Sequence, residues 1–170
     1  FGGEAGAQNP STRSRIEGAL GIDAYDYFGL GEIGPTFASE SVAKSGLIWA
    51  EDHHIIEVLD EDTKKPVPGG EVGILVITHL TREAPPMLRY WTNDYARVEN
   101  SPSSCGRTHL RSPGGILGRH DDLIIYRGAK FYPIQVEDIV RSFPELSNEF
   151  RVEMHSDEAT GRDRCVVVAE

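Results

Sequence analysis

The sequence has few basic residues, little cysteine and no long hydrophobic run. Lys and Arg number 17 against 27 Asp and Glu, so the formal net charge of the 170 residues is −10. A nucleic-acid-binding domain needs a basic face that displaces counterions from phosphates, and this balance argues against such a partner. No apolar run approaches the roughly 20 residues that span a bilayer, so we also expect no membrane segment.

Only two cysteines, Cys105 and Cys165, are present. Free thiols are typical of a reducing compartment, and we expect a cytoplasmic protein. His53, His54, Cys105 and His109 are candidate metal ligands, but "CGRTH" lacks the paired CxxC spacing of a structural zinc site. The first ten residues have no basic segment followed by an apolar one, which argues against a signal peptide. Both ends look cut.

The residues that are present, 39% hydrophobic and 26% charged, are typical of a globular protein. A helix is predicted after the cap residue Asn9, with Pro10 in its first turn and Gly21 closing it. The stretch "IDAYDYFGLGEIGP" then predicts a short aromatic strand and a Gly-rich loop that carries Glu32. Such a loop is a usual place for a ligand in α/β folds, but any tight turn looks the same.

Residues 45–98 change to a pattern of short strands separated by turn formers. "GLIWA", "HHIIEVLD", "EVGILVITHL" and "MLRYWT" predict a small antiparallel sheet or barrel. The stretch "ENSPSSCGRTHLRSPGG" is predicted to be a loop. After Gly118, "LIIYRG" and "FYP" predict strand–turn–strand, and a helix from Pro133 to Phe143 follows. "EFRVEMHS" and "CVVVAE" are two further strands, so the whole is a mixed α/β (α+β) fold.

Three polar residues are candidates for a site on their own chemistry. Glu32 can be a Mg²⁺ ligand or a solvated turn carboxylate. Asp94 follows a strand and can accept hydrogen bonds from a sugar diol, or it can be an ordinary turn residue. Arg119 can donate to phosphate or ribose, or it can pair with Asp121 at the surface.

Five motifs together are more specific. "FGLGEIGP", "EDH", "LTREAPPMLRYWTND", "GRHDDLIIYRG" and "FYPIQVED" occur in this order, and the chain resembles the phenylacetate–CoA ligase family of acyl-adenylate-forming enzymes. The resemblance implies that residues 1–119 are the C-terminal part of the large domain, with the nucleotide and acyl site and a β subdomain. It implies that residues 120–170 are an incomplete ferredoxin-like lobe that swivels.

This resemblance implies an AMP-forming ligase that uses ATP, Mg²⁺ and coenzyme A. A carboxylic acid, with phenylacetate as the default, becomes an acyl-adenylate and then a CoA thioester. Two alternatives stay open: a related adenylyl transferase that places AMP on a deazaflavin hydroxyl, and a non-catalytic homologue that still binds a nucleotide.

Residue roles follow from the same resemblance. It gives Glu32 to Mg²⁺ and to catalysis, Asp94 and Arg119 to the ribose hydroxyls, and Phe28 and Gly29 to the adenine side of the nucleotide. Asp121 is the swivel residue, and Gly128 lies in a turn that faces the site in the thioester-forming state. Five further residues line the adenine and acyl side: Gly3, Glu4, Ile33, Gly34 and Pro35.

Several positions depart from the family pattern. Phe28 stands where the family usually has Tyr, Gly31 replaces Ser or Thr, and Trp91 stands in place of Arg. A diverged substrate or a weakened enzyme fits these changes equally. The family's phosphate loop and catalytic Lys fall upstream and downstream of this sequence, so we expect that the 170 residues do not turn over alone.

Overall fold

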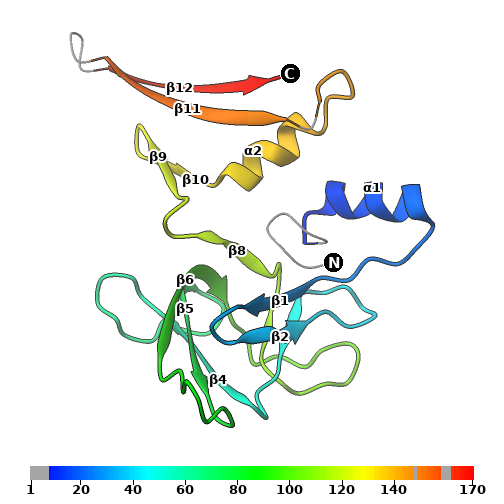
Figure 1. Cartoon of the computed structure of the whole chain (residues 1–170), viewed down its shortest axis with the longest axis vertical. Coiled ribbons are helices and arrows are strands. Elements are labelled where there is room, and N and C mark those ends of the chain that lie inside the picture. The colour runs from blue at the N-terminus through cyan, green and yellow to red at the C-terminus, as the bar shows by residue number, and fades with distance from the viewer. Residues whose placement is uncertain (1–7, 148, 158–161) are drawn as a thin grey trace. The chain divides into compact units, whose positions relative to one another are not determined.

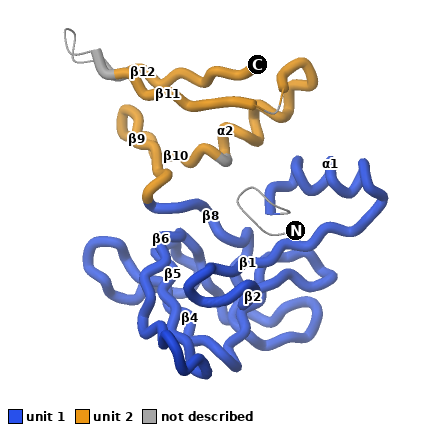
Figure 2. The backbone as a smooth tube through the Cα atoms, viewed as in Figure 1, with its two compact units in different colours: residues 1–120 blue, residues 121–170 orange. Residues whose placement is uncertain are grey.

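The computed structural model describes residues 8–147, 149–157 and 162–170. The predicted site residues Gly3 and Glu4 lie outside the described residues. Contacts divide the chain into two compact units, residues 1–120 and residues 121–170 (Figure 2). The boundary between the units lies one residue beyond the predicted one.

Unit 1 begins with helix α1, Pro10–Leu20. The Asn9 side chain accepts hydrogen bonds from the amides of Ser11 and Thr12, and Gly21 closes the helix in the left-handed conformation at φ 63°. A residue with a Cβ is strained in that conformation, which is why glycine is common there. The predicted helix is confirmed at both ends.

Two four-stranded antiparallel sheets make up most of unit 1 (Figure 1). The first has the order β1-β2-β3-β7, with bounds Tyr27–Leu30, Gly34–Ser39, Leu47–Trp49 and Arg111–Ser112. The second has the order β4-β5-β6-β8, with bounds His54–Leu59, Val72–His79, Tyr90–Arg97 and Ile116–Arg119. The antiparallel prediction is confirmed. The pattern did not reveal β2, β7 or β8. Strands β7 and β8 pair with residues that lie far back along the chain, in β3 and β6, whereas β2 pairs with its chain neighbours β1 and β3.

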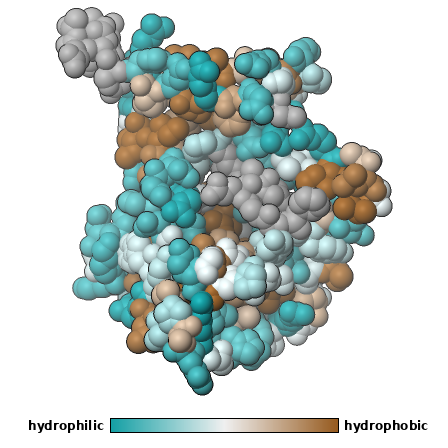
Figure 3. All heavy atoms as spheres, in the orientation of Figure 1, coloured by the Kyte–Doolittle hydropathy of each residue, from teal (hydrophilic) through white to brown (hydrophobic). Residues whose placement is uncertain are grey.

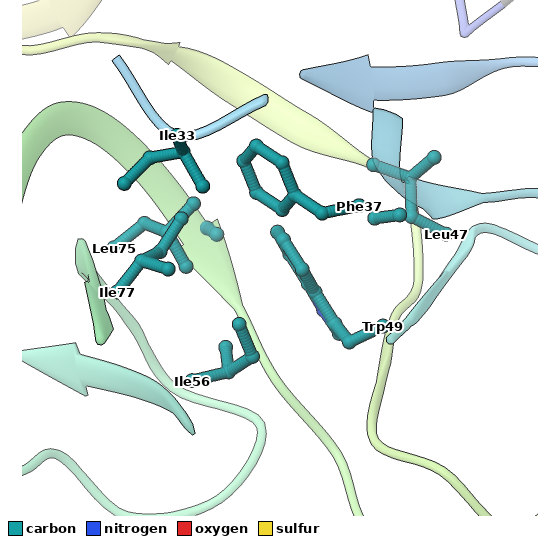
Figure 4. Packing of buried hydrophobic residues seen from close by; sticks show 9 residues of the cluster. Ile33, Phe37, Leu47, Trp49, Ile56, Leu75 and Ile77 are labelled. Atoms are coloured by element: carbon teal, nitrogen blue, oxygen red, sulfur yellow. The ribbon is translucent and has the colours of Figure 1, made fainter. Parts of the chain in front are cut away.

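The core of unit 1 combines side chains from both sheets (Figure 4). Trp49 is fully buried, and its ring stacks on Phe37 with centroids 6.0 Å apart. The second sheet contributes Leu75 and Ile77 from β5, whose central residues are all buried. Burial on both faces explains why "GILVI" reads as a continuous apolar run. The core thereby fixes β1 and β2 against β5.

Helix α1 is attached mainly by charged side chains. Arg13 pairs with Glu40 at 2.6 Å, and Lys44 pairs with Glu17 at 2.5 Å. Only Thr12 of the helix is buried. Leu20 at its end exposes 62% of its surface. Hydrophobic surface is visible over the end of α1 in Figure 3. Polar contacts, rather than a buried apolar stripe, therefore hold this helix.

Asp26 introduces a pH dependence at this attachment. It is buried beside a polar pocket of about 320 Å³. Burial, and then the negative charge of Glu40, raise the pKa of Asp26 from 3.8 to about 6. The folded state holds the proton of Asp26 more tightly than the unfolded state does. This carboxyl therefore does not lower the free energy of unfolding below pH 4, and it lowers that free energy progressively as the pH rises to 6.

We therefore expect Asp26→Asn to leave stability unchanged at pH 4 and to raise it at pH 7.5. The gain is on the order of 3 kcal/mol, from about 1.4 kcal/mol for each pH unit between the two pKa values. Denaturant unfolding of both proteins at the two pH values measures it. An equal effect at both pH values would show that Asp26 does not titrate in this way.

The described residues of unit 2 form two hairpins and one helix. Strands β9 (Ile124–Tyr126) and β10 (Ala129–Phe131) pair across Arg127 and Gly128, which have φ values of 50° and 82°. Helix α2 spans Pro133–Val140, and β11 (Phe150–Asp157) pairs with β12 (Arg162–Ala169). The predicted order β-β-α-β-β is confirmed.

The prediction that this helix reaches Phe143 is wrong. After Val140 the amides of Ser142 and Phe143 bond to carbonyls three residues back, at Ile139 and Val140. Pro144 follows, and a residue before proline is disfavoured in the α conformation. The helical spacing of apolar residues therefore extends to Phe143, although the helix itself ends at Val140. Among the described residues, no helix is long and apolar enough to cross a membrane.

Candidate functional site

Glu32 lies in the tight connection between β1 and β2. Residues 31–33 form this turn, and the Ile33 amide donates to the Leu30 carbonyl at 3.1 Å. The Glu32 side chain is exposed, whereas Ile33 is 2% exposed and belongs to the core. Because Ile33, directly after Glu32, is anchored in the core, the backbone position from which the Glu32 side chain projects is fixed. The short loop thus presents one carboxylate to solvent from a rigid base.

Two side chains, one from the last residue of β5 and one from the segment after it, hold this loop by its carbonyls. Arg82 donates to the carbonyls of Glu32 and Ile33, the latter at 3.1 Å. His79 Nε2 donates to the Ile33 carbonyl at 2.8 Å. The His79 ring also lies 4.4 Å from that of His54, whose pKa is lowered by burial. No role was predicted for Arg82 or His79 from the sequence.

Phe28 and Gly29 shape β1 before the loop. The Phe28 ring packs edge-on against Phe37 and Trp49, with centroids 5.3 and 6.0 Å away. A Cβ on Gly29 would lie 2.1 Å from the Pro35 carbonyl oxygen. Phe28 is therefore part of the core packing, and Gly29 allows β1 and β2 to approach. Contact of either residue with adenine stays a prediction.

Gly29→Ala is expected to destabilise unit 1 and to displace the Glu32 loop. The added methyl group meets backbone rather than a flexible side chain, and such overpacking costs about 1–3 kcal/mol. Thermal unfolding checks the stability. Gly31→Ala is the matched control, since its Cβ would meet nothing within 4 Å. Equal stability of the two variants would contradict the expectation.

Asp94 and Arg119 face each other across β6 and β8. They are register partners, and Arg119 Nη1 lies 3.8 Å from Asp94 Oδ1. Asp94 is 4% exposed, and its backbone amide donates to Thr92 Oγ1 at 3.0 Å. Thr92 in turn donates to the Leu75 carbonyl at 3.0 Å. The carboxylate and guanidinium therefore sit at a fixed place in the sheet.

Tyr90 brings these candidates together. Burial raises the pKa of its phenol, and the charge of Glu32 and a hydrogen bond with it act in the same direction. The charges of Asp94 and Arg119 also act on this hydroxyl. The charges of Glu32, Asp94 and Arg119, which are far apart in the sequence, thus all reach one tyrosine hydroxyl. Sequence analysis missed Tyr90, although it begins the "YWTND" stretch that contains Asp94.

Other predicted residues fall into different settings. The Ile33 side chain is used by the core, while Pro35 is exposed and Gly34 has open space around its Cα. Their contact with an acyl group stays a prediction. Asp121 opens unit 2, and Gly128 lies in the β9–β10 turn. Their roles also stay predictions.

The candidate zinc ligands form no metal site among the described residues, where no three His, Cys, Asp or Glu side chains are grouped for one. Cys105 is exposed, and its sulfur lies 3.1 Å from Ser103 Oγ. Hydrogen bonds from Ser103, the Arg107 amide and Ser41 lower the pKa of this thiol to about 7. The described surroundings of Cys105 are hydroxyl groups and amides rather than metal ligands.

Curated proteins that are similar in sequence to this chain are phenylacetate-coenzyme A ligases. Over 143 residues the chain is 44% identical to a phenylacetate-coenzyme A ligase of Thermus thermophilus, which covers 82% of the chain and 32% of the relative. The chain is homologous to phenylacetate-CoA ligases. A second such ligase, from Aromatoleum evansii, is 38% identical over 92% of the chain and 35% of its own length. The chain spans about a third of the length of these relatives, and no family model matches it.

Solved structures agree with this homology. A 2-hydroxyisobutyryl-CoA ligase in the postadenylation state, in complex with 2-HIB-AMP, superposes with a TM-score of 0.81 at 33% identity over 88% of this chain and 32% of that one. An open conformation of that ligase, in complex with 2-HIB-AMP and CoA, gives a TM-score of 0.70 at 34% identity over 89% and 34% of the two chains. The mostly β, mixed fold therefore matches part of an adenylate-forming ligase.

Proposed function

We propose that this chain carries part of the active site of an AMP-forming acid–CoA ligase. The observation that carries the proposal is the pairing of Asp94 with Arg119 across β6 and β8, with the charge of Glu32 acting on the neighbouring Tyr90, in a homologue of phenylacetate-CoA ligases. The proposed reaction joins a carboxylate oxygen to the α-phosphorus of ATP and releases pyrophosphate. The thiol of CoA then attacks the acyl carbon, and AMP leaves.

The setting of Glu32 fits a Mg²⁺ ligand. Mg²⁺ in nucleotide sites takes one or two carboxylates and fills its remaining positions with phosphate oxygens and water. An exposed carboxylate on a loop that Arg82 holds by the backbone meets this need. When bound, the cation would neutralise the negative charge that develops on the phosphates.

Asp94 and Arg119 fit a ribose. A diol donates to carboxylate oxygens and accepts from a guanidinium, and Asp94 and Arg119 supply one of each at adjacent register positions. Because the pair is held by β6 and β8, the sugar would be oriented without ordering a loop. Positioning of this kind supplies much of the rate enhancement in group transfer.

Unit 2 contributes a mobile lobe in this proposal. Asp121 is its first residue, and the Arg127–Gly128 turn is a rigid hairpin end on it. We assign the unit to the swivelling C-terminal lobe, with Asp121 as the pivot and Gly128 near the site during thioester formation. Rotation of a lobe between half-reactions lets one site carry out two chemical steps.

The substrate is an aryl or short acyl acid, with phenylacetate as the first choice because the matched relatives are phenylacetate-coenzyme A ligases. The use of ATP and CoA, together with two free cysteines, supports a cytoplasmic location.

The test is ATP–pyrophosphate exchange by the protein that carries this chain, expressed at its full length. A panel of aryl and alkyl acids is assayed with and without CoA. Acid-dependent exchange, with thioester formed only when CoA is present, is the expected result. Exchange that needs no acid, or a deazaflavin adenylated instead, would contradict the ligase.

A further inference from the structure

The last residue of unit 1, His120, is tied to the sheet by its backbone. Strand β8 ends at Arg119, and the His120 amide still donates to the Asn93 carbonyl at 2.6 Å. Asn93 has a φ of 65°, a conformation that side chains rarely adopt, within the irregular part of β6. The hydrogen bond from His120 to Asn93 thus extends the β6–β8 pairing by one residue, at the position where the backbone of β6 turns. Asp121 then begins the other unit.

The His120 side chain is tied to the same sheet. His120 Nδ1 lies 2.9 Å from the Tyr95 hydroxyl and 3.3 Å from Glu61 Oε2. Tyr95 also donates to Glu61. With the imidazole proton on Nδ1, that nitrogen donates to the Tyr95 hydroxyl, which in turn donates to Glu61. The Glu61 carboxylate also lies close to the same ring nitrogen. Glu61, Tyr95 and His120 thus form a triangle of close polar contacts, which we name the His120 clamp.

Both partners of His120 have firm support. Tyr95 is 8% exposed and lies in β6 next to Asp94. Glu61 lies in the β4–β5 turn, where Asp60 Oδ1 accepts from the Thr63 amide at 2.7 Å. The ammonium of Lys64, from the same turn, lies 4.0 Å from the centre of the Trp91 ring on β6. A carboxylate held in this way is a better anchor than one on a mobile surface side chain.

We propose that the His120 clamp fixes the unit 1 end of the connection between the two units, so that backbone rotation starts at Asp121. The proposal rests on the proposed function, in which the units rotate between half-reactions. A fixed end keeps Arg119 beside Asp94 while the lobe moves. Without the clamp, the flexible point would extend back to Gly118, whose φ of 148° already departs from a regular strand.

The clamp residues are positioning residues, not catalytic residues. Glu61→Ala and His120→Ala remove one corner each, and Tyr95→Phe removes only the hydroxyl. His120 and Glu61 are partly exposed, with side-chain exposures of 48% and 29%, so these variants keep the core intact. Glu71→Ala is the matched control, since it truncates an exposed glutamate in the same hairpin.

The test is hydrogen exchange by mass spectrometry on the protein that carries this chain at full length. Loss of one net hydrogen bond predicts about fivefold faster exchange of the amides of residues 119–121 in each clamp variant. Amides of β5 should exchange at the wild-type rate, as should all amides in the control. Unchanged exchange at residues 119–121, or acceleration spread through β5 and β6, would overturn the clamp.

A kinetic measurement separates positioning from general stability. Acid-dependent pyrophosphate exchange needs one arrangement of the units, whereas each thioester turnover needs the rotation. We expect the clamp variants to lower the kcat of thioester formation about fivefold while pyrophosphate exchange changes less than about twofold. Equal losses in both assays would contradict a role at the pivot. A wild-type protein that makes no thioester would instead contradict the proposed function, and hydrogen exchange would then still decide the clamp.

Discussion

Replacing Glu32 with glutamine is expected to lower acid-dependent ATP–pyrophosphate exchange by about 100-fold, the usual size of losing one aimed charge-stabilising group in a transition state. The amide keeps the size of the side chain but removes the negative charge that a Mg²⁺ ion requires. The loop itself should not change, because Arg82 bonds to the Glu32 carbonyl rather than to its carboxylate. Exchange rates at saturating acid and ATP measure the effect.

Two comparisons make this result specific. Thermal unfolding of the variant should match wild type, since the Glu32 side chain is exposed. Glu71→Gln, which neutralises an exposed carboxylate outside the site, should keep full exchange. If Glu32→Gln retains more than a tenth of the wild-type rate at every Mg²⁺ concentration, Glu32 is not the metal ligand.

Trp49→Ala is expected to have the largest effect on stability. Its side chain is fully buried between the two sheets, and its indole nitrogen donates to Ser112 Oγ at 2.9 Å. Truncating a buried tryptophan costs about 3–5 kcal/mol, because a cavity remains where the ring was. Here it also leaves the buried Ser112 hydroxyl without its donor. Denaturant unfolding, followed at a fixed pH, measures the loss.

The two tryptophans of the chain form a matched pair for this experiment. Trp91 is partly exposed and lies against Lys64. Its replacement by alanine should cost less than about 1 kcal/mol, the range of an exposed cation–π contact. Trp49→Phe keeps an aromatic ring and provides a variant that still folds, with an intermediate loss. Equal losses for Trp49→Ala and Trp91→Ala would show that the inter-sheet core does not dominate the stability of unit 1.

Sequence alone predicted the features that depend on neighbouring residues. The ends of α1 follow from Asn9 and Gly21, which act within one turn of the helix. The β9–β10 hairpin follows from the Arg127–Gly128 turn between two short apolar runs. The ordered motifs also identified the family that the ligase homologues then supported, because their order and spacing are properties of the chain itself.

The tertiary structure decided what depends on distant residues. Glu32 meets Arg82, and Asp94 meets Arg119, only because β2, β5, β6 and β8 take particular places in two sheets. The His120 clamp joins the β4–β5 turn to the end of β8 in the same way. Sheet order and register arise from the packing of a shared core, which no local window of sequence contains. The sequence by itself determined the local elements and the homology, and the fold brought Tyr90 to the centre of the candidate site.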